Sequence, residues 1–106
     1  MRLVTFSFTL PSDPEALKKY AEKAKSWSDV LLSEPNVTEL RVYRSPSGKD
    51  ALAVIRVQSL AGIEELFAAE KFQALRRALE NAGCNNFKLG LWEASPMMPE
   101  PIRRAM

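Results

Sequence analysis

The sequence predicts an α+β fold in which strands and helical regions follow one another in the order β-α-β-β-α-β. Two observations lead to this fold class. Four segments alternate apolar and polar residues, which is typical of half-buried strands. Two longer segments repeat apolar residues every three or four positions, the period of an amphipathic helix. The chain has 106 residues, 46% of them hydrophobic, and this is enough for one domain with its own core.

The strands are predicted from their alternation. Residues 2–10 place Val4, Phe6 and Phe8 on one face and the residues between them on the other. The same alternation predicts strands at 37–44, 51–58 and 86–93. Because residues 45–49 have the composition of a turn, the second and third strands are expected to form a hairpin.

The helices are predicted from their apolar spacing and their end signals. Asp13 is the expected N-cap of the first helix and Pro14 its first residue, and the helix is expected to end near Leu32. In the second helical region the step from Phe67 to Phe72 is five residues, which a straight helix cannot keep on one face. We therefore expect a short helix over 60–68 and a second one over 70–81.

This order of elements predicts a ferredoxin-like domain with a four-stranded antiparallel sheet, whose helices pack on one face. The more uniformly apolar set of strand residues is assigned to the helix-covered face: Val4, Phe6, Phe8, Leu40, Val42, Ala53, Ile55, Val57, Phe87, Leu89 and Leu91. The opposite face is mixed and carries Leu3, Thr5, Ser7, Arg41, Tyr43, Leu52, Val54, Arg56, Gln58, Gly90 and Trp92. An exposed apolar patch of this kind usually marks an interface, so we expect a homodimer through this face of the sheet.

The domain is expected to span residues 1–95 and to be followed by an extended, Pro-rich C-terminal tail over 96–106. Prolines disfavour regular structure in this tail, yet it also contains several apolar residues, namely Met97, Met98, Ile102 and Met106. Two interpretations remain open. The tail is either a disordered end or a strap that lies on a partner subunit.

The composition excludes several functions. A net charge of +2 without a block of like charges predicts no nucleic-acid partner. No apolar run is long enough for a transmembrane helix, and the N-terminus lacks the pattern of a signal peptide, so a cytoplasmic protein without a membrane partner is expected. The chain has one cysteine, Cys84, and no histidine, so neither a metal site nor a histidine-dependent mechanism is expected.

Residues 2–93 resemble the dimeric α/β-barrel superfamily, and most of all the antibiotic biosynthesis monooxygenase group. The resemblance rests on the element order, on the short loop at 33–36, and on the stretch 57–78, in which Ser59, a short helix, residues 69–72 and Leu75 follow a strand. It implies a cavity beside the sheet for a small aromatic or polyketide-like molecule, which some relatives oxidise without metal or flavin. No cofactor is expected. Haem-degrading relatives rely on a histidine, which this chain lacks.

The candidate ligand-binding residues fall into two groups. Trp27 is the best candidate for a stacking wall, accompanied by Tyr20, Phe67 and Phe72, although residues at this spacing are also typical of a core. The second group lies on the expected dimer face and comprises Arg41, Tyr43, Arg56 and Trp92. Its arginines form either an ion pair with Glu39 or Glu93, or an anion-binding pair across the two-fold axis.

The sequence is consistent with two main functions, because no motif in it specifies one reaction or identifies catalytic residues. The first is a cofactor-independent monooxygenase-like enzyme that acts on a small aromatic or polyketide-like substrate. The second is a non-catalytic dimeric module that binds a small molecule or serves a stress response. A free-standing effector domain is a third, but no DNA-binding helix pair precedes the domain.

Overall fold

The computed structural model describes residues 2–105, and it has the predicted β-α-β-β-α-β order with the second helical region divided in two. Met1 and Met106, which belong to the predicted domain and tail, lie outside the described residues. The elements are β1 (Arg2–Thr9), α1 (Pro14–Leu32), β2 (Val37–Arg44), β3 (Asp50–Val57), α2 (Ile63–Ala68), α3 (Glu70–Asn81) and β4 (Asn85–Glu93). The observed strand ends differ from the predicted ones by one residue at most.

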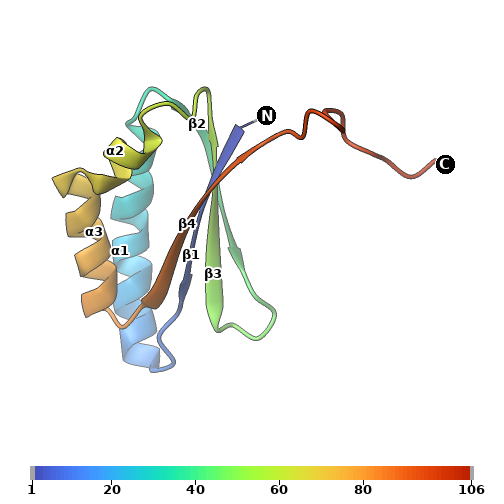
Figure 1. Cartoon of the computed structure of the whole chain (residues 1–106). Coiled ribbons are helices and arrows are strands. Elements are labelled where there is room, and N and C mark those ends of the chain that lie inside the picture. Colours follow the sequence, from blue (N-terminus) through green and yellow to red (C-terminus); the bar gives the residue numbers. More distant parts are fainter. Residues whose placement is uncertain (1, 106) are drawn as a thin grey trace.

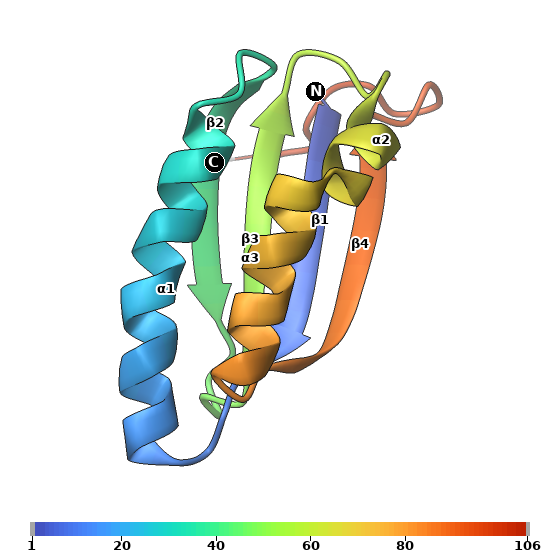
Figure 2. The ribbon, with the colours of Figure 1, turned by 90° about the vertical axis from the view of Figure 1, so that its left-hand side faces the viewer.

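The four strands form one antiparallel sheet in the order β2-β3-β1-β4. All three helices lie on the same side of this sheet, and the opposite side is left uncovered by the rest of the chain (Figure 1). Seen from the helical side, α1 and α3 run along the sheet while α2 lies near one end of it (Figure 2). The structure is thus the ferredoxin-like fold that the sequence predicts.

Local sequence signals explain most helix ends. Asp13 accepts a hydrogen bond from the backbone N–H of Ala16 at 3.1 Å and caps α1, with Pro14 in the first turn. The start of α2 differs from the prediction, since the helix begins at Ile63 and not at Leu60. Gly62 has a φ of +78°, a left-handed conformation that ends the preceding turn and excludes residues 60–62 from the helix.

The break between α2 and α3 lies at Ala69, as the sequence predicts. Its backbone is extended, with φ −64° and ψ 150°, so it ends one helix and precedes the next. Because the chain changes direction there, Phe67 and Phe72 both reach the same side, and their ring centroids lie 5.1 Å apart. A continuous helix could not bring these two rings together.

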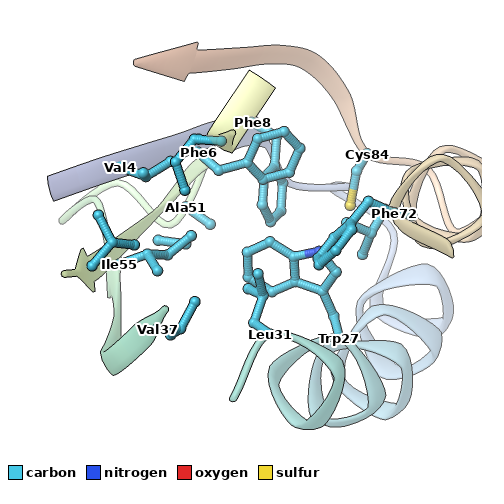
Figure 3. Close-up of a cluster of buried hydrophobic side chains, with 14 of the residues drawn as sticks. Val4, Phe6, Phe8, Trp27, Leu31, Val37, Ala51, Ile55, Phe72 and Cys84 are labelled. Carbon is cyan, nitrogen blue, oxygen red and sulfur yellow. The ribbon is translucent and has the colours of Figure 1, made fainter. Parts of the chain in front are cut away.

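The core lies between the helices and the sheet (Figure 3). Val4 and Ile55 from the two central strands are fully buried, as is Leu31 from α1. The helix-covered face is less completely covered at its edges than the sequence predicts. Val42 on β2 is 49% exposed and Leu89 on β4 is 42% exposed, because both belong to edge strands that the helices do not overlie fully.

The segment after β4 leaves the domain on the side opposite the helices (Figure 1). Residues 95–98 form a small turn, in which the N–H of Met98 donates to the carbonyl of Ser95 at 3.1 Å. Residues 99–105 have no helix or strand. We call residues 96–105 the C-terminal arm. Among the described residues, no helix is long and apolar enough to cross a membrane.

Candidate functional site

A pocket with aromatic walls lies between the sheet and the helices. Its walls come from Phe6 on β1, Trp27 on α1, Phe67 on α2 and Phe72 on α3, so every helix contributes. The volume is about 220 Å³, and the remaining lining residues are Glu64, Ala68, Gln73, Arg76 and Leu89. We call this cavity the aromatic pocket.

Phe6 is the centre of the aromatic wall. Its ring centroid lies 5.6 Å from that of Trp27 and 6.5 Å from that of Phe67. On the sheet it stacks on Phe87 at 5.5 Å, with 21° between the ring planes. Figure 3 shows Trp27 reaching from α1 toward Phe6 and Phe8, with Phe72 beside it. Such an arrangement can hold a flat apolar ring by stacking and edge contacts.

Polar groups reach the pocket from α2 and α3 only. Gln73 is held in place, because its side-chain amide donates to the carbonyl of Phe67 at 2.8 Å. Arg76 lies with its guanidinium carbon 5.1 Å from the centroid of Phe87 and its Nε 3.4 Å from a carboxylate oxygen of Glu80. Glu64 stands in the first turn of α2 and is exposed. The pocket therefore combines an apolar interior with one cation and one carboxylate at its border.

Trp27 also borders a second, smaller cavity. This cavity has a volume of about 120 Å³ and lies between α1 and the sheet, where Tyr20, Trp27, Val42 and Ala53 contribute to its lining. Trp27 therefore contributes to the lining of both cavities. Trp27 itself is buried, with 6% of its surface exposed.

Three cross-strand rows make up the uncovered face of the sheet. The pairing registers place Trp92, Leu3, Arg56 and Glu39 in one row, Gly90, Thr5, Val54 and Arg41 in the next, and Lys88, Ser7, Leu52 and Tyr43 in the third. Each row crosses all four strands. Apolar side chains of this face remain exposed, with Tyr43 at 47% and Trp92 at 58%.

The two arginines of this face have partners within the chain. Arg56 lies 3.5 Å from a carboxylate oxygen of Glu39, one of the two acids that the sequence proposed as partners. Arg41 lies 6.0 Å from the ring centroid of Tyr43, and a hydrogen bond to Tyr43 raises the pKa of Arg41 above its usual range. With Leu3 and Val54, these four residues line a hollow of about 240 Å³.

Trp92 lies flat on this face because Gly90 has no side chain. The indole Nε1 donates to the hydroxyl of Thr5 at 2.8 Å. A Cβ on Gly90 would come within 2.6 Å of that hydroxyl and within 2.7 Å of the indole nitrogen. The position of the indole is therefore set by a glycine two residues away on the same strand.

Two titratable groups, the buried Cys84 and the half-buried Tyr20, are held neutral. Burial raises the pKa of the Cys84 thiol to about 11. Burial, and to a lesser extent Cys84, raises the pKa of Tyr20 above its usual value. Neither group is therefore an activated nucleophile near neutral pH. Within residues 2–105, no cluster of three or more acidic, cysteine or histidine residues could hold a metal ion.

The predicted site residues lie on opposite sides of the sheet. Trp27 borders the aromatic pocket on the helical side, whereas Arg41, Tyr43, Arg56 and Trp92 are on the uncovered face. Gln73, Arg76 and Glu64 are not among the site residues predicted from the sequence. Helical spacing could have indicated Gln73 and Arg76, since Arg76 lies four residues after Phe72 and three after Gln73 on α3.

Solved structures with the same fold are known, although no protein-family model matches the chain and no curated protein is a significant match. One is a Deinococcus radiodurans protein with the provisional name antibiotic biosynthesis monooxygenase, at 14% identity and a TM-score of 0.76 over 100% of both chains. A second is SnoaB, a cofactor-independent oxygenase from Streptomyces nogalater, at 12% identity and a TM-score of 0.68 over 93% of this chain and 96% of that one.

A third structure is a dimeric ferredoxin-like protein of unknown function from Jannaschia sp. CCS1. It is 14% identical, with a TM-score of 0.66 over 88% of this chain and 99% of that one. At these identities the similarity shows the fold, which is that of the antibiotic biosynthesis monooxygenase-like ferredoxin-fold proteins. Proteins of this fold include both oxygenases and proteins of unknown function.

Proposed function

We propose that this chain binds a small flat aromatic molecule in the aromatic pocket and oxidises it with dioxygen, without a metal or an organic cofactor. The observation that carries the proposal is the pocket itself. Four aromatic rings from the sheet and all three helices surround one cavity, and a guanidinium and a carboxylate stand at its border. Apolar walls with a few convergent polar groups are the usual composition of a small-molecule site.

The volume of the aromatic pocket limits the size of the molecule. A cavity of roughly 150 Å³ holds benzene, and the aromatic pocket measures about 220 Å³. One or two fused rings can therefore be enclosed, whereas a longer ring system would extend beyond the pocket or displace Trp27. The expected substrates are therefore the smallest of the aromatic or polyketide-like molecules.

The proposed reaction converts a phenol to a para-quinone. One oxygen atom of O₂ enters the ring carbon para to the hydroxyl as a carbonyl, and the other leaves as water with the phenolic hydrogen and the hydrogen of that carbon. The substrate supplies all four electrons, so no external reductant is needed. Arg76 would stabilise the phenolate that reacts with dioxygen, and Glu64 would accept the phenolic proton.

Binding without reaction is the second candidate function. It is favoured by the absence of histidine from the whole chain, which leaves a carboxylate as the proton acceptor of the pocket. In this case the same walls and the same Arg76 would select an aromatic anion and release it unchanged.

The first experiment measures binding and turnover with 1-naphthol. We expect saturable binding by isothermal titration, oxygen consumption in an electrode, and formation of 1,4-naphthoquinone by absorbance. Arg76→Gln is expected to weaken binding at least tenfold, and Arg77→Gln is its matched control. Arg77 neighbours it on α3 but pairs with Glu70 and does not line the pocket.

A second pair of variants separates reaction from binding. Glu64→Gln should leave the affinity for 1-naphthol unchanged and reduce turnover at least tenfold, while the exposed neighbour Glu65→Gln should change neither. Binding without oxygen consumption across a panel of naphthols and quinols would support the second candidate. Absence of binding across the same panel would overturn both.

We also propose that the protein is a homodimer whose subunits meet through the uncovered face of the sheet. The exposed Tyr43, Leu52 and Trp92 support this, since contiguous apolar side chains on an open sheet usually mark an interface. Light scattering should give twice the 11.9 kDa of one chain. Lys88→Glu combined with Trp92→Glu should shift the mass to that of one chain, whereas Lys18→Glu on the exposed side of α1 should not. A wild-type mass of one chain would contradict the dimer.

A further inference from the structure

We propose that the C-terminal arm, residues 96–105, is exchanged between the two subunits, so that each arm packs along the outside of its partner. This inference rests on the dimer proposed above. The arm is not required by the fold of one chain, since its described hydrogen bonds lie within the turn over residues 95–98. These hydrogen bonds therefore do not tie the arm to the sheet of its own chain.

The side chains of the arm are unusually apolar for a solvated end. Met97 is 89% exposed, Ile102 78% and Met98 61%. On one chain most of the surface of these side chains stays in water, and a partner that covers them would remove it from water. The pattern is that of a segment that packs against a second surface.

The direction of the arm identifies that surface. The arm leaves the end of β4 on the uncovered side of the sheet and points away from the helices (Figure 1). Two packed sheets lie about 10 Å apart. Ten extended residues span roughly 30 Å. An arm of this length cannot fit between two sheets and has to continue along the side of the second copy.

The prolines limit the conformations that the arm can adopt. Pro96, Pro99 and Pro101 fix their own φ angles and restrict the residues before them to extended conformations. Less conformational entropy is therefore lost when the arm is bound than with a flexible segment. The same prolines remove backbone donors, so the contact is expected to depend on the apolar side chains and not on a continuous added strand.

A hollow marks where the arm and the face meet. It has a volume of about 520 Å³ and lies between Leu3 and Trp92 of the sheet and Met98, Pro99 and Pro101 of the arm. The second copy is the occupant to which we assign this hollow, because both of its walls border the proposed interface. A side chain of the partner inserted there would contact the sheet and the arm at once.

The test uses the full chain with a photoreactive benzoylphenylalanine in place of Ile102. Irradiation at micromolar concentration is expected to give a covalent species of twice 11.9 kDa on a denaturing gel. The same residue in place of Lys18, on the exposed side of α1, is the control and should give no covalent dimer. Peptide mapping should place the cross-link from position 102 between two chains.

A second measurement follows the dissociation constant by analytical ultracentrifugation. Removal of residues 96–106, and the double variant M97S with I102S, should each raise it at least tenfold. The Arg103→Gln variant, which leaves the apolar side chains in place, should change it less than threefold.

The outcomes separate the two proposals. A one-chain mass for the wild type would overturn the dimer and the exchange together. A stable dimer without cross-links between chains from position 102, and with an unchanged dissociation constant after truncation, would leave the dimer standing and overturn the exchange.

Discussion

Substitution of Gly90 by alanine tests how the uncovered face is organised. The added Cβ would lie 2.6 Å from the Thr5 hydroxyl and 2.7 Å from Nε1 of Trp92, and side chains do not pack at such distances. Because Thr5 is held on the neighbouring central strand, the exposed indole of Trp92 is the group that has to move. Its hydrogen bond to Thr5 is lost as it does so.

The effect of Gly90→Ala on the stability of a single chain is expected to be small. Loss of one exposed hydrogen bond costs about 1 kcal/mol. Alanine restricts the unfolded chain and is favoured over glycine inside a strand by about 0.5–1 kcal/mol. The backbone at residue 90 is not left-handed, so alanine adds no strain there. The two effects nearly cancel, and the free energy of unfolding should change by less than about 1 kcal/mol.

The effect on the interface is expected to be much larger. A displaced indole projects from the face into the space that a second copy would occupy, so the dimer should weaken at least tenfold. Trp27 and Trp92 are the two tryptophans of the chain. In a Trp27→Phe background the emission reports on Trp92 alone, and Gly90→Ala should shift it to longer wavelength, while ultracentrifugation reports the dissociation constant.

The control for this substitution is Thr5→Val, which removes the hydroxyl without filling the space above Gly90. It should preserve the emission wavelength to a greater extent than Gly90→Ala does. Unchanged emission and an unchanged dissociation constant in Gly90→Ala would refute the reasoning, because the indole would then not have been displaced.

Three further substitutions test the fold. Asp13→Ala should lower the free energy of unfolding by about 1 kcal/mol in chemical denaturation, because the N-cap bond to Ala16 is lost. Gly83→Ala should cost more than about 1 kcal/mol in the same assay, since residue 83 has φ +102° and the new Cβ would lie 3.0 Å from Pro11; equal stability would contradict this. The pKa of Cys84 is raised to about 11 in the folded chain, so its neutral thiol stabilises the fold below about pH 9 and this contribution falls as pH rises to 11. The difference in stability between wild type and Cys84→Ala should therefore change over that range, and a constant difference would exclude the linkage.

Local patterns were sufficient for the elements of the fold and for the faces of the strands. Alternation assigned Phe6 to the helical side and Trp92 to the other, because successive strand side chains point to opposite faces. The five-residue step between Phe67 and Phe72 predicted the helix break, since it is incompatible with one straight helix. The same kind of evidence placed Asp13 at the start of α1.

Tertiary structure decided which of these residues meet. Periodicity assigns a residue to a face but does not say which strands are neighbours, and β1 pairs with β3 and β4, which lie far from it in sequence. That pairing places Thr5 beside Gly90 and brings the hydroxyl within reach of Trp92. Likewise, Arg76 enters the candidate site only because the break at Ala69 sets the direction of α3. Such long-range contacts depend on the packing of whole elements, and no local pattern encodes them.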